Sequence, residues 1–181
     1  MLELSLHILD VVENGLTAGA SLIEIELDKD ENLDLLTISV IDNGRGIAIE
    51  DLPKVVDPFY TTRTTRNVGL GLPLLKQSAE QTGGSFRIES QVGQGTTLFA
   101  QFHLSHLDRA PLGDMQGTLM SLIVGRPDVD FIYRQKNGND EFILDTREIK
   151  EALDGMSMSD PEVINFLRKN IAEGLAELGP I

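Results

Sequence analysis

The chain has no cysteine and no tryptophan among its 181 residues, and basic residues are scarce beside acidic ones. The absence of cysteine excludes disulfides and thiolate-bound metals, and it favours a cytoplasmic protein. With 15 basic and 29 acidic residues, the formal net charge is −14. That charge opposes nonspecific binding to nucleic acid or to an anionic membrane. We therefore expect neither nucleic acid nor membrane among the partners.

Long apolar runs and two common phosphate-binding patterns are also missing. No stretch approaches the roughly 18 apolar residues that a membrane span needs, and no basic segment precedes an apolar one as in a signal peptide. There is no G-x-x-x-x-G-K-[ST] loop, and the pair Gly69 and Gly71 lacks the third glycine of a dinucleotide-binding fingerprint. Hydrophobic residues make up 41% of the chain, enough for the core of one domain with or without an appendage.

The spacing of apolar residues predicts alternating helices and strands. The acidic stretch 28–34 is predicted as a turn, 57–69 as a loop and 105–112 as a boundary. We expect helices over 3–19, 50–56, 70–81, 113–124 and 146–154, strands over 22–27, 35–41, 85–90, 96–104, 131–134 and 141–144, and a last helix that begins at a capping box over 159–162 and ends near residue 178.

Two polar residues of the first helix, Asp10 and Asn14, are four positions apart and share one helix face. Mg²⁺ takes oxygen ligands and is usually completed by substrate phosphates, a role that suits the carbonyl oxygen of Asn14. A carboxylate one turn earlier could orient or deprotonate a nucleophile. Taken alone, the pair is more often the polar face of an amphipathic helix. His7, one turn before Asp10, is expected to be structural.

The segment Asp42-Asn43-Gly44-Arg45-Gly46 follows the second predicted strand. A carboxylate at Asp42 can accept a hydrogen bond from the amino group of an adenine. Gly44 and Gly46 would let the backbone approach a flat ring closely. Asp-Asn-Gly is also ordinary turn chemistry, so a simple tight turn explains the segment about as well.

Two further glycine motifs point to the same kind of ligand. Gly69-Leu70-Gly71-Leu72 opens a predicted helix, where exposed N–H groups attract phosphate oxygens. Arg63 and Arg66 precede it and form a small basic island in an acidic protein. Gly95-Thr96-Thr97 could bring a hydroxyl to the edge of an adenine. Taken alone, a glycine pair at a helix start is often only structural, and the Gly95 segment is more often a β-turn.

The order and spacing of these motifs resemble the ATPase fold shared by sensor histidine kinases, type II topoisomerases, mismatch-repair ATPases and anti-sigma kinases, the GHKL or Bergerat-fold superfamily. The matching segments are the N box at 10–18, the first glycine box at 42–47, the F box at 57–63, the second glycine box at 68–72 and the closing glycine-threonine element at 93–96. Independent motifs in a fixed order are far more specific than any one of them.

This resemblance implies an α+β two-layer sandwich whose mixed, mostly antiparallel sheet is covered by helices. It covers about residues 1–104, and we divide the chain into an ATP-binding domain over 1–106 and an α/β extension over 107–181. The extension matches no family pattern. It is either a docking module for a partner or structural cover packed on the sheet, and the sequence favours neither.

The resemblance also implies ATP and Mg²⁺ as cofactors. Asn14 would be the metal ligand, Asp10 the catalytic carboxylate, and Asp42 the acceptor for the adenine amino group. Phe59 is expected to anchor the base of the loop, and the charge and position of Arg63 and Arg66 assign them to the γ-phosphate. The complete expected nucleotide-binding set is Asn14, Asp42, Gly44, Gly46, Ile47, Arg63, Arg66, Gly69, Leu70, Gly71, Leu72 and Thr96.

For function, the resemblance implies a kinase that acts in trans on an unidentified protein partner. Sensor kinases of the family carry a phosphoacceptor helix before the N box, whereas here the N box begins near Met1. The alternative is an ATP-dependent switch or anti-sigma-like binding module with little hydrolysis, because fast hydrolysers carry Glu where Asp10 stands and Asp is one methylene shorter. A third hypothesis is a degenerate module that binds no nucleotide.

Overall fold

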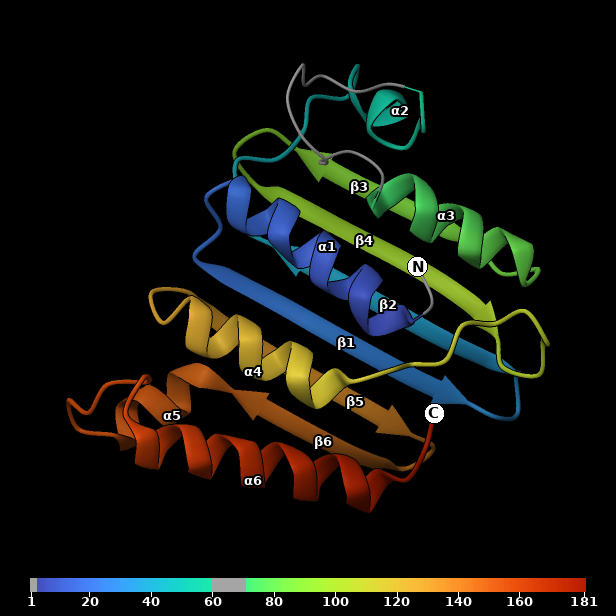
Figure 1. The fold of residues 1–181 in the computed structure, drawn as a ribbon. Helices are drawn as coiled ribbons and strands as arrows, with labels where there is room; N and C mark the ends of the chain where they lie inside the picture. The colour runs from blue at the N-terminus through green and yellow to red at the C-terminus, as the bar shows by residue number, and fades with distance from the viewer. Residues whose placement is uncertain (1–2, 60–70) are drawn as a thin grey trace.

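The computed structural model describes residues 3–59 and 71–181. In this part of the chain, six strands form one sheet in the order β3-β4-β2-β1-β5-β6, with α1, α3, α4 and α6 arranged over one face (Figure 1). The elements in chain order are α1 (Leu4–Thr17), β1 (Leu22–Asp30), β2 (Leu35–Asp42), α2 (Leu52–Val55), α3 (Gly71–Gln81), β3 (Phe86–Gln91), β4 (Gly95–His103), α4 (Met115–Gly125), β5 (Asp130–Asn137), β6 (Asp140–Asp145), α5 (Thr146–Ala152) and α6 (Pro161–Leu178).

The sheet is mixed. Strand β1 pairs parallel to β5, and the other neighbouring strands pair antiparallel. The expected two-layer α+β sandwich with a mostly antiparallel sheet is therefore confirmed. Two boundaries are wrong: β1 continues to Asp30, so the turn predicted over 28–34 is shorter, and β5 continues to Asn137 instead of ending at residue 134. Strand β1 has partners on both sides, and Lys29 pairs with Leu36 of β2 and Asn137 of β5, which extends the strand into the acidic stretch.

The hairpin of the C-terminal segment extends the sheet of the N-terminal segment. Strand β5 lies beside β1 over its whole length, and β6 forms the sheet edge beyond it. Phe131 of β5 and Leu167 of α6 belong to the same buried cluster as Ile25 of β1 and Leu98 of β4. The segment therefore shares the core with the rest of the chain. The division between residues 106 and 107, and a docking role for the extension, stay predictions.

Alternation along β2 decides where its last residue points. Leu36, Ile38 and Val40 are buried in the core that α1 and the other helices cover. Because successive side chains of a strand point to opposite faces, Asp42 continues this inward series at the end of the strand. A carboxylate is thus placed on the helix side of the sheet, below the C-terminal half of α1.

The start of α1 is held by the connector between β4 and α4. Glu3 makes no side-chain cap, and the first helical N–H groups would otherwise lack partners. The N–H of Leu4 donates to the carbonyl of Pro111 at 2.9 Å, and that of Ser5 to the carbonyl of Leu112 at 2.8 Å. The connector that leads to the C-terminal segment therefore fixes the helix that carries Asp10 and Asn14.

The cap of the last helix differs from the predicted capping box. The N-cap of α6 is Asp160 instead of Ser159, and its carboxylate accepts from the N–H of Glu162 at 2.9 Å. Pro161 stands at the first helical position, where a missing N–H costs nothing, so the residue before it becomes the cap. Within residues 3–59 and 71–181, no helix combines the length and the apolar character needed to cross a membrane.

Candidate nucleotide site

The carboxylate of Asp42 lies between α1 and the loop that follows β2. A Cβ added to Gly15 would lie 3.0 Å from the Cβ of Asp42, and one added to Gly44 would lie 2.9 Å from its Oδ1. Glycine at these positions keeps the space around the carboxylate open. Burial raises the pKa of Asp42, and hydrogen bonds from the backbone of Gly44 and Thr96 oppose that rise. No feature of the sequence singled out Gly15.

The loop after β2 is fixed at both ends. The side-chain oxygen of Asn43 accepts from the N–H groups of Ser21 and Leu22 at 2.9 and 3.0 Å. The N–H of Arg45 donates to the carbonyl of Ala18 at 3.0 Å. Gly46 has a φ of +71°, and a Cβ there would collide with the carbonyl of Gln91. Glycine is therefore required at residue 46 by both conformation and space.

The closing element of the sequence lies directly against this loop. Thr96 of β4 pairs with Asp42 in the β2–β4 register. The hydroxyl of Ser90, on β3, accepts from the N–H of Ile47 at 2.8 Å and lies 2.9 Å from Oγ1 of Thr96. Ser90 was missed by the sequence analysis, because no motif distinguishes it from any other strand serine.

Helices α1 and α3 meet at Asp10. A Cβ added to Gly71, the first residue of α3, would lie 2.9 Å from the Cβ of Asp10 and 3.1 Å from its Oδ2. Burial raises the pKa of the Asp10 carboxyl. Asn14, one turn further along α1, is exposed, and its side chain makes no hydrogen bond within the described residues. Together these residues supply side-chain oxygens beside the start of a helix.

The structure thus gathers residues from separate motifs at one end of the sheet. Leu72 instead packs against the hydrophobic core, and the residues Arg63, Arg66, Gly69 and Leu70 lie outside the described part of the chain, so their assignments stay predictions. The gathered residues are Asp10, Asn14, Asp42, Gly44, Gly46, Ile47, Gly71 and Thr96.

One expectation near the loop is wrong. Phe59 does not anchor the loop base, because its side chain is 94% exposed. A local turn explains its position: the carboxylate of Asp57 accepts from the N–H of Phe59 at 2.9 Å, which leaves the ring in solvent. The structural role expected of His7 agrees with its placement, 2% exposed in α1. Burial lowers the pKa of His7 to about 4, so its ring is neutral at physiological pH.

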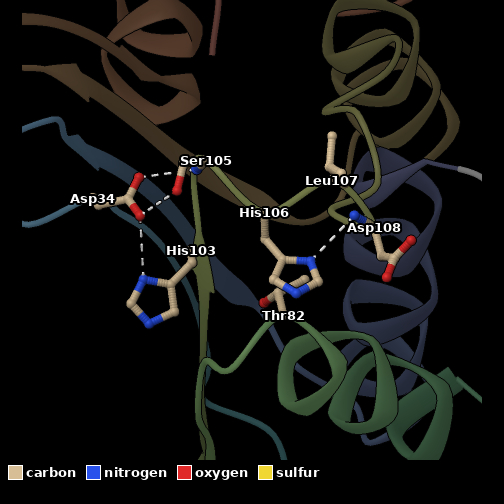
Figure 2. Close-up of a pocket in the computed structure, with 7 residues that line it drawn as sticks. All are labelled: Asp34, Thr82, His103, Ser105, His106, Leu107 and Asp108. Atoms are coloured by element: carbon tan, nitrogen blue, oxygen red, sulfur yellow. Dashed lines mark hydrogen bonds and ion pairs between the residues drawn. The ribbon is translucent and has the colours of Figure 1, made fainter.

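A second group of polar side chains lines an open hollow at the opposite end of the same strands (Figure 2). The carboxylate of Asp34 accepts from the N–H and hydroxyl of Ser105 at 2.9 and 2.7 Å, and it lies 3.5 Å from Nδ1 of His103. Nδ1 of His106 accepts from the N–H of Asp108 at 3.1 Å. The Ser105 hydrogen bond is the largest cause that lowers the pKa of Asp34.

Asp34 contacts Ser105 and His103, and His106 contacts Asp108. Asp34 stands about 26 Å from Asp42, at roughly 3.3 Å per residue of an extended strand. Nowhere in residues 3–59 and 71–181 do three His, Asp or Glu side chains gather so that they could hold a metal ion. The hollow therefore adds no ligand to the cluster around Asp42, and that cluster is the candidate nucleotide site.

Comparison with known proteins agrees with this geometry. A profile of the family described as histidine kinase-, DNA gyrase B- and HSP90-like ATPase matches residues 2–107. The match covers more than half of the chain and spans every motif of the candidate site. The chain belongs to this family of ATP-binding domains.

Curated relatives are similar over the same part. The chain is 35% identical over 97 residues to a non-motile and phage-resistance protein of Caulobacter vibrioides, a match that covers 51% of this chain and 12% of the relative. It is 42% identical over 81 residues to the sensor protein SrrB of Staphylococcus aureus, covering 42% of this chain and 14% of the relative. The chain thus spans a small fraction of the length of these relatives.

A solved structure extends the likeness to the C-terminal segment. The crystal structure of the N-terminal domain of a DNA repair protein superposes with a TM-score of 0.58 at 16% identity. It covers 95% of this chain and 56% of that one. At this identity the likeness shows the fold alone. The fold that includes β5, β6 and the last helices therefore exists in another protein.

Proposed function

We propose that this chain binds Mg-ATP at the end of the sheet that carries Asp42, and that it transfers the γ-phosphoryl group to a partner protein in the cytoplasm. The observation that carries the proposal is the convergence of Asp10, Asn14 and Asp42 with the start of α3. The chain belongs to a family of ATPases, and the matched residues include all of these positions.

The residues present fit the groups that the proposal requires. Asp42 and Thr96 would face the base, and the first N–H groups of α3 would face the phosphates. The amide oxygen of Asn14 is the hard oxygen ligand that Mg²⁺ prefers, with phosphates and water completing its shell. When bound, the metal neutralises phosphate charge. Its role at Asn14 is supported by an exposed side chain that lacks a protein partner among the described residues.

Asp10 is proposed as the group that receives a proton. The bond between the γ-phosphorus and the bridging oxygen breaks, ADP leaves, and a bond forms to the nucleophile of the partner. The proton of that nucleophile passes to the Asp10 carboxylate, whose pKa is raised by burial toward the range useful for proton transfer. Because residue 71 is a glycine, no side chain blocks the approach to Asp10.

The positions of the histidines support transfer in trans. The side chain of His7 is buried on the inner face of α1. His103 and His106 lie at the end of the sheet opposite to Asp42. None of them can reach a phosphoryl group held near Asp10 of the same molecule. None of the three histidines thus serves as the acceptor, and we propose that a His or Ser of a partner protein does.

The test is phosphoryl transfer from labelled ATP to purified candidate partners encoded beside this gene. Label should move to a partner, and Asp10→Asn should reduce the rate by about 100-fold or more. Glu13→Gln is the matched control, because Glu13 is an exposed carboxylate on the same helix. Transfer to no candidate, or an equal loss in both variants, would overturn the kinase proposal.

The metal assignment has its own test. Asn14→Ala should weaken Mg-ATP binding by about tenfold while leaving adenosine binding nearly unchanged, because adenosine has no phosphates to share a metal. Titration calorimetry with both ligands measures the two effects. An equal loss for ATP and adenosine would contradict a metal ligand at this position.

A second candidate function, an ATP-dependent switch, is favoured by one observation. The connector after β4 binds the first N–H groups of α1, the helix that carries Asp10 and Asn14. Movement of α1 on ATP binding would therefore reach α4 and the C-terminal segment. Hydrogen exchange of residues 111–125 with and without Mg-ATP tests this coupling, and unchanged exchange would remove the switch hypothesis.

A further inference from the structure

The hydroxyl of Ser90 joins the three segments that line the base side of the candidate site. It donates to the carbonyl of Gly95 at 2.7 Å and accepts from the N–H of Ile47 at 2.8 Å. Its third contact, at 2.9 Å, is with Oγ1 of Thr96. One half-buried hydroxyl thus connects the loop after β2, strand β3 and the start of β4.

The number of available hydrogens fixes the direction of these bonds. A serine hydroxyl has one hydrogen and two lone pairs. The carbonyl of Gly95 has no hydrogen, so Ser90 must supply its own for that short contact. The N–H of Ile47 occupies one lone pair of Ser90, and the second is left for the hydroxyl of Thr96. The hydroxyl of Thr96 therefore donates its only hydrogen to Ser90.

Thr96 consequently presents lone pairs alone to a ligand. Next to it in the register is Asp42, whose ionised carboxylate is also an acceptor and carries no hydrogen. The N–H of Gly44 points to Oδ1 of Asp42 at 2.8 Å and is occupied there. The side chains at this spot offer two acceptors and no donor.

We propose that Ser90 is a positioning residue that makes the base subsite accept hydrogen bonds only, so that the site selects nucleotides with an amino group at position 6 of the purine and rejects a 6-keto purine. The inference rests on the proposed ATP site and deepens it. The two hydrogens of an amino group at position 6 can pair directly with both acceptors, Asp42 and Thr96. A 6-keto purine brings one hydrogen at this edge, on N1, and its keto oxygen then faces the second acceptor, which stays unpaired.

Removal of the Ser90 hydroxyl should change this selectivity in a defined direction. In Ser90→Ala the hydroxyl of Thr96 loses its fixed acceptor, so it can rotate and donate to a keto oxygen. In Thr96→Val the hydroxyl is replaced by a methyl group of similar size, so the acceptor disappears and no donor is gained. Ser90→Thr keeps the hydroxyl and is the conservative control.

The experiment compares ATP with inosine triphosphate, which has a keto oxygen at position 6 and a hydrogen on N1, by titration calorimetry with Mg²⁺. Wild type should prefer ATP by about tenfold or more. In Ser90→Ala the ratio of the affinities for ATP and inosine triphosphate should fall by about threefold or more, partly because inosine triphosphate binds more tightly. Thr96→Val should weaken ATP without strengthening inosine triphosphate, and Ser90→Thr should keep the wild-type ratio. Thermal melts establish that each variant is folded.

The outcomes separate this inference from the proposed function. If folded wild type binds neither nucleotide, the proposed ATP site is wrong. If ATP binds but the preference is the same in Ser90→Ala and in wild type, Ser90 is merely structural and the inference is overturned. Should Ser90→Ala fail to fold, Thr96→Val decides: an equal loss for both nucleotides contradicts the acceptor role of Thr96.

Discussion

Strands β2 and β4 run side by side and carry polar side chains at both ends, yet the two ends differ in how those side chains are used. At one end Asp42 pairs with Thr96, and at the other Leu35 pairs with His103 beside Asp34. Both carboxylates are half-buried, but burial raises the pKa of Asp42, whereas hydrogen bonds from Ser105 lower the pKa of Asp34.

This difference between the two ends indicates which polar cluster is suited to bind a ligand. The side chain of Asp34 is matched within its own cluster, by Ser105 and His103. Around Asp42 the backbone is held tightly by Asn43 and Ser90, while acceptor capacity on the side chains stays unused. A rigid frame with unmatched acceptors favours binding of a donor, and a cluster of matched groups favours stability.

The largest effect is expected from a change in the backbone that surrounds Asp42, at Gly46. Gly46→Ala should reduce ATP affinity by about 100-fold or more, because the new methyl group collides with the carbonyl of Gln91 in a left-handed conformation. Gly93→Ala is the matched control: Gly93 also has a positive φ, but its Cβ would meet open space. It should cost about 1 kcal/mol of stability and less than about threefold in affinity. Similar affinity losses in both variants would contradict a frame set by residue 46.

The second largest effect is expected from removing the charge of Asp42, with Asp34 as the comparison. Asp42→Asn should weaken ATP binding by about 10- to 100-fold, since a charged acceptor is lost from the base subsite. Asp34→Asn should lower the melting temperature while ATP affinity stays within about twofold, because its partners lie at the far end of the sheet. Titration and thermal melts of the two variants check the assignment. Weaker ATP binding in Asp34→Asn would show that the ends are coupled.

A smaller effect is expected from lowering the pH, which should act differently on Asp42 and on Asp34. In the proposed ATP site the adenine amino group donates to ionised Asp42, so affinity should be full above the raised pKa of Asp42 and fall as pH drops through it. The folded pKa of Asp34 is lowered, so its stabilisation is present above the unfolded value of 3.8 and is lost only below that value. ATP titrations and melts from pH 7 to pH 3 should show affinity falling before the Asp34 contribution does. Affinity that stays constant down to pH 3.8 in folded protein would contradict the assignment of Asp42.

Much of the fold could be predicted from local patterns. The alternation in β1 and β2 and the helical spacing of α1 are set by residues close in sequence, and both predictions held to within a few positions. The end of β1 was wrong because its last residues are held by ladders to β2 and β5, which no local pattern reveals. Phe59 was placed wrongly for a related reason, since the turn at Asp57 decides where its ring lies.

The sequence by itself determined the family and predicted the residues of the candidate nucleotide site, because a fixed order of short motifs is specific even when each motif is weak. Only the tertiary structure decided that the hairpin after residue 130 joins the same sheet, that Gly15 makes room for Asp42, and that the hydroxyl of Ser90 lies within hydrogen-bond distance of Thr96. The physical reason is that hydrogen-bond direction and strand pairing depend on atoms brought together from distant parts of the chain.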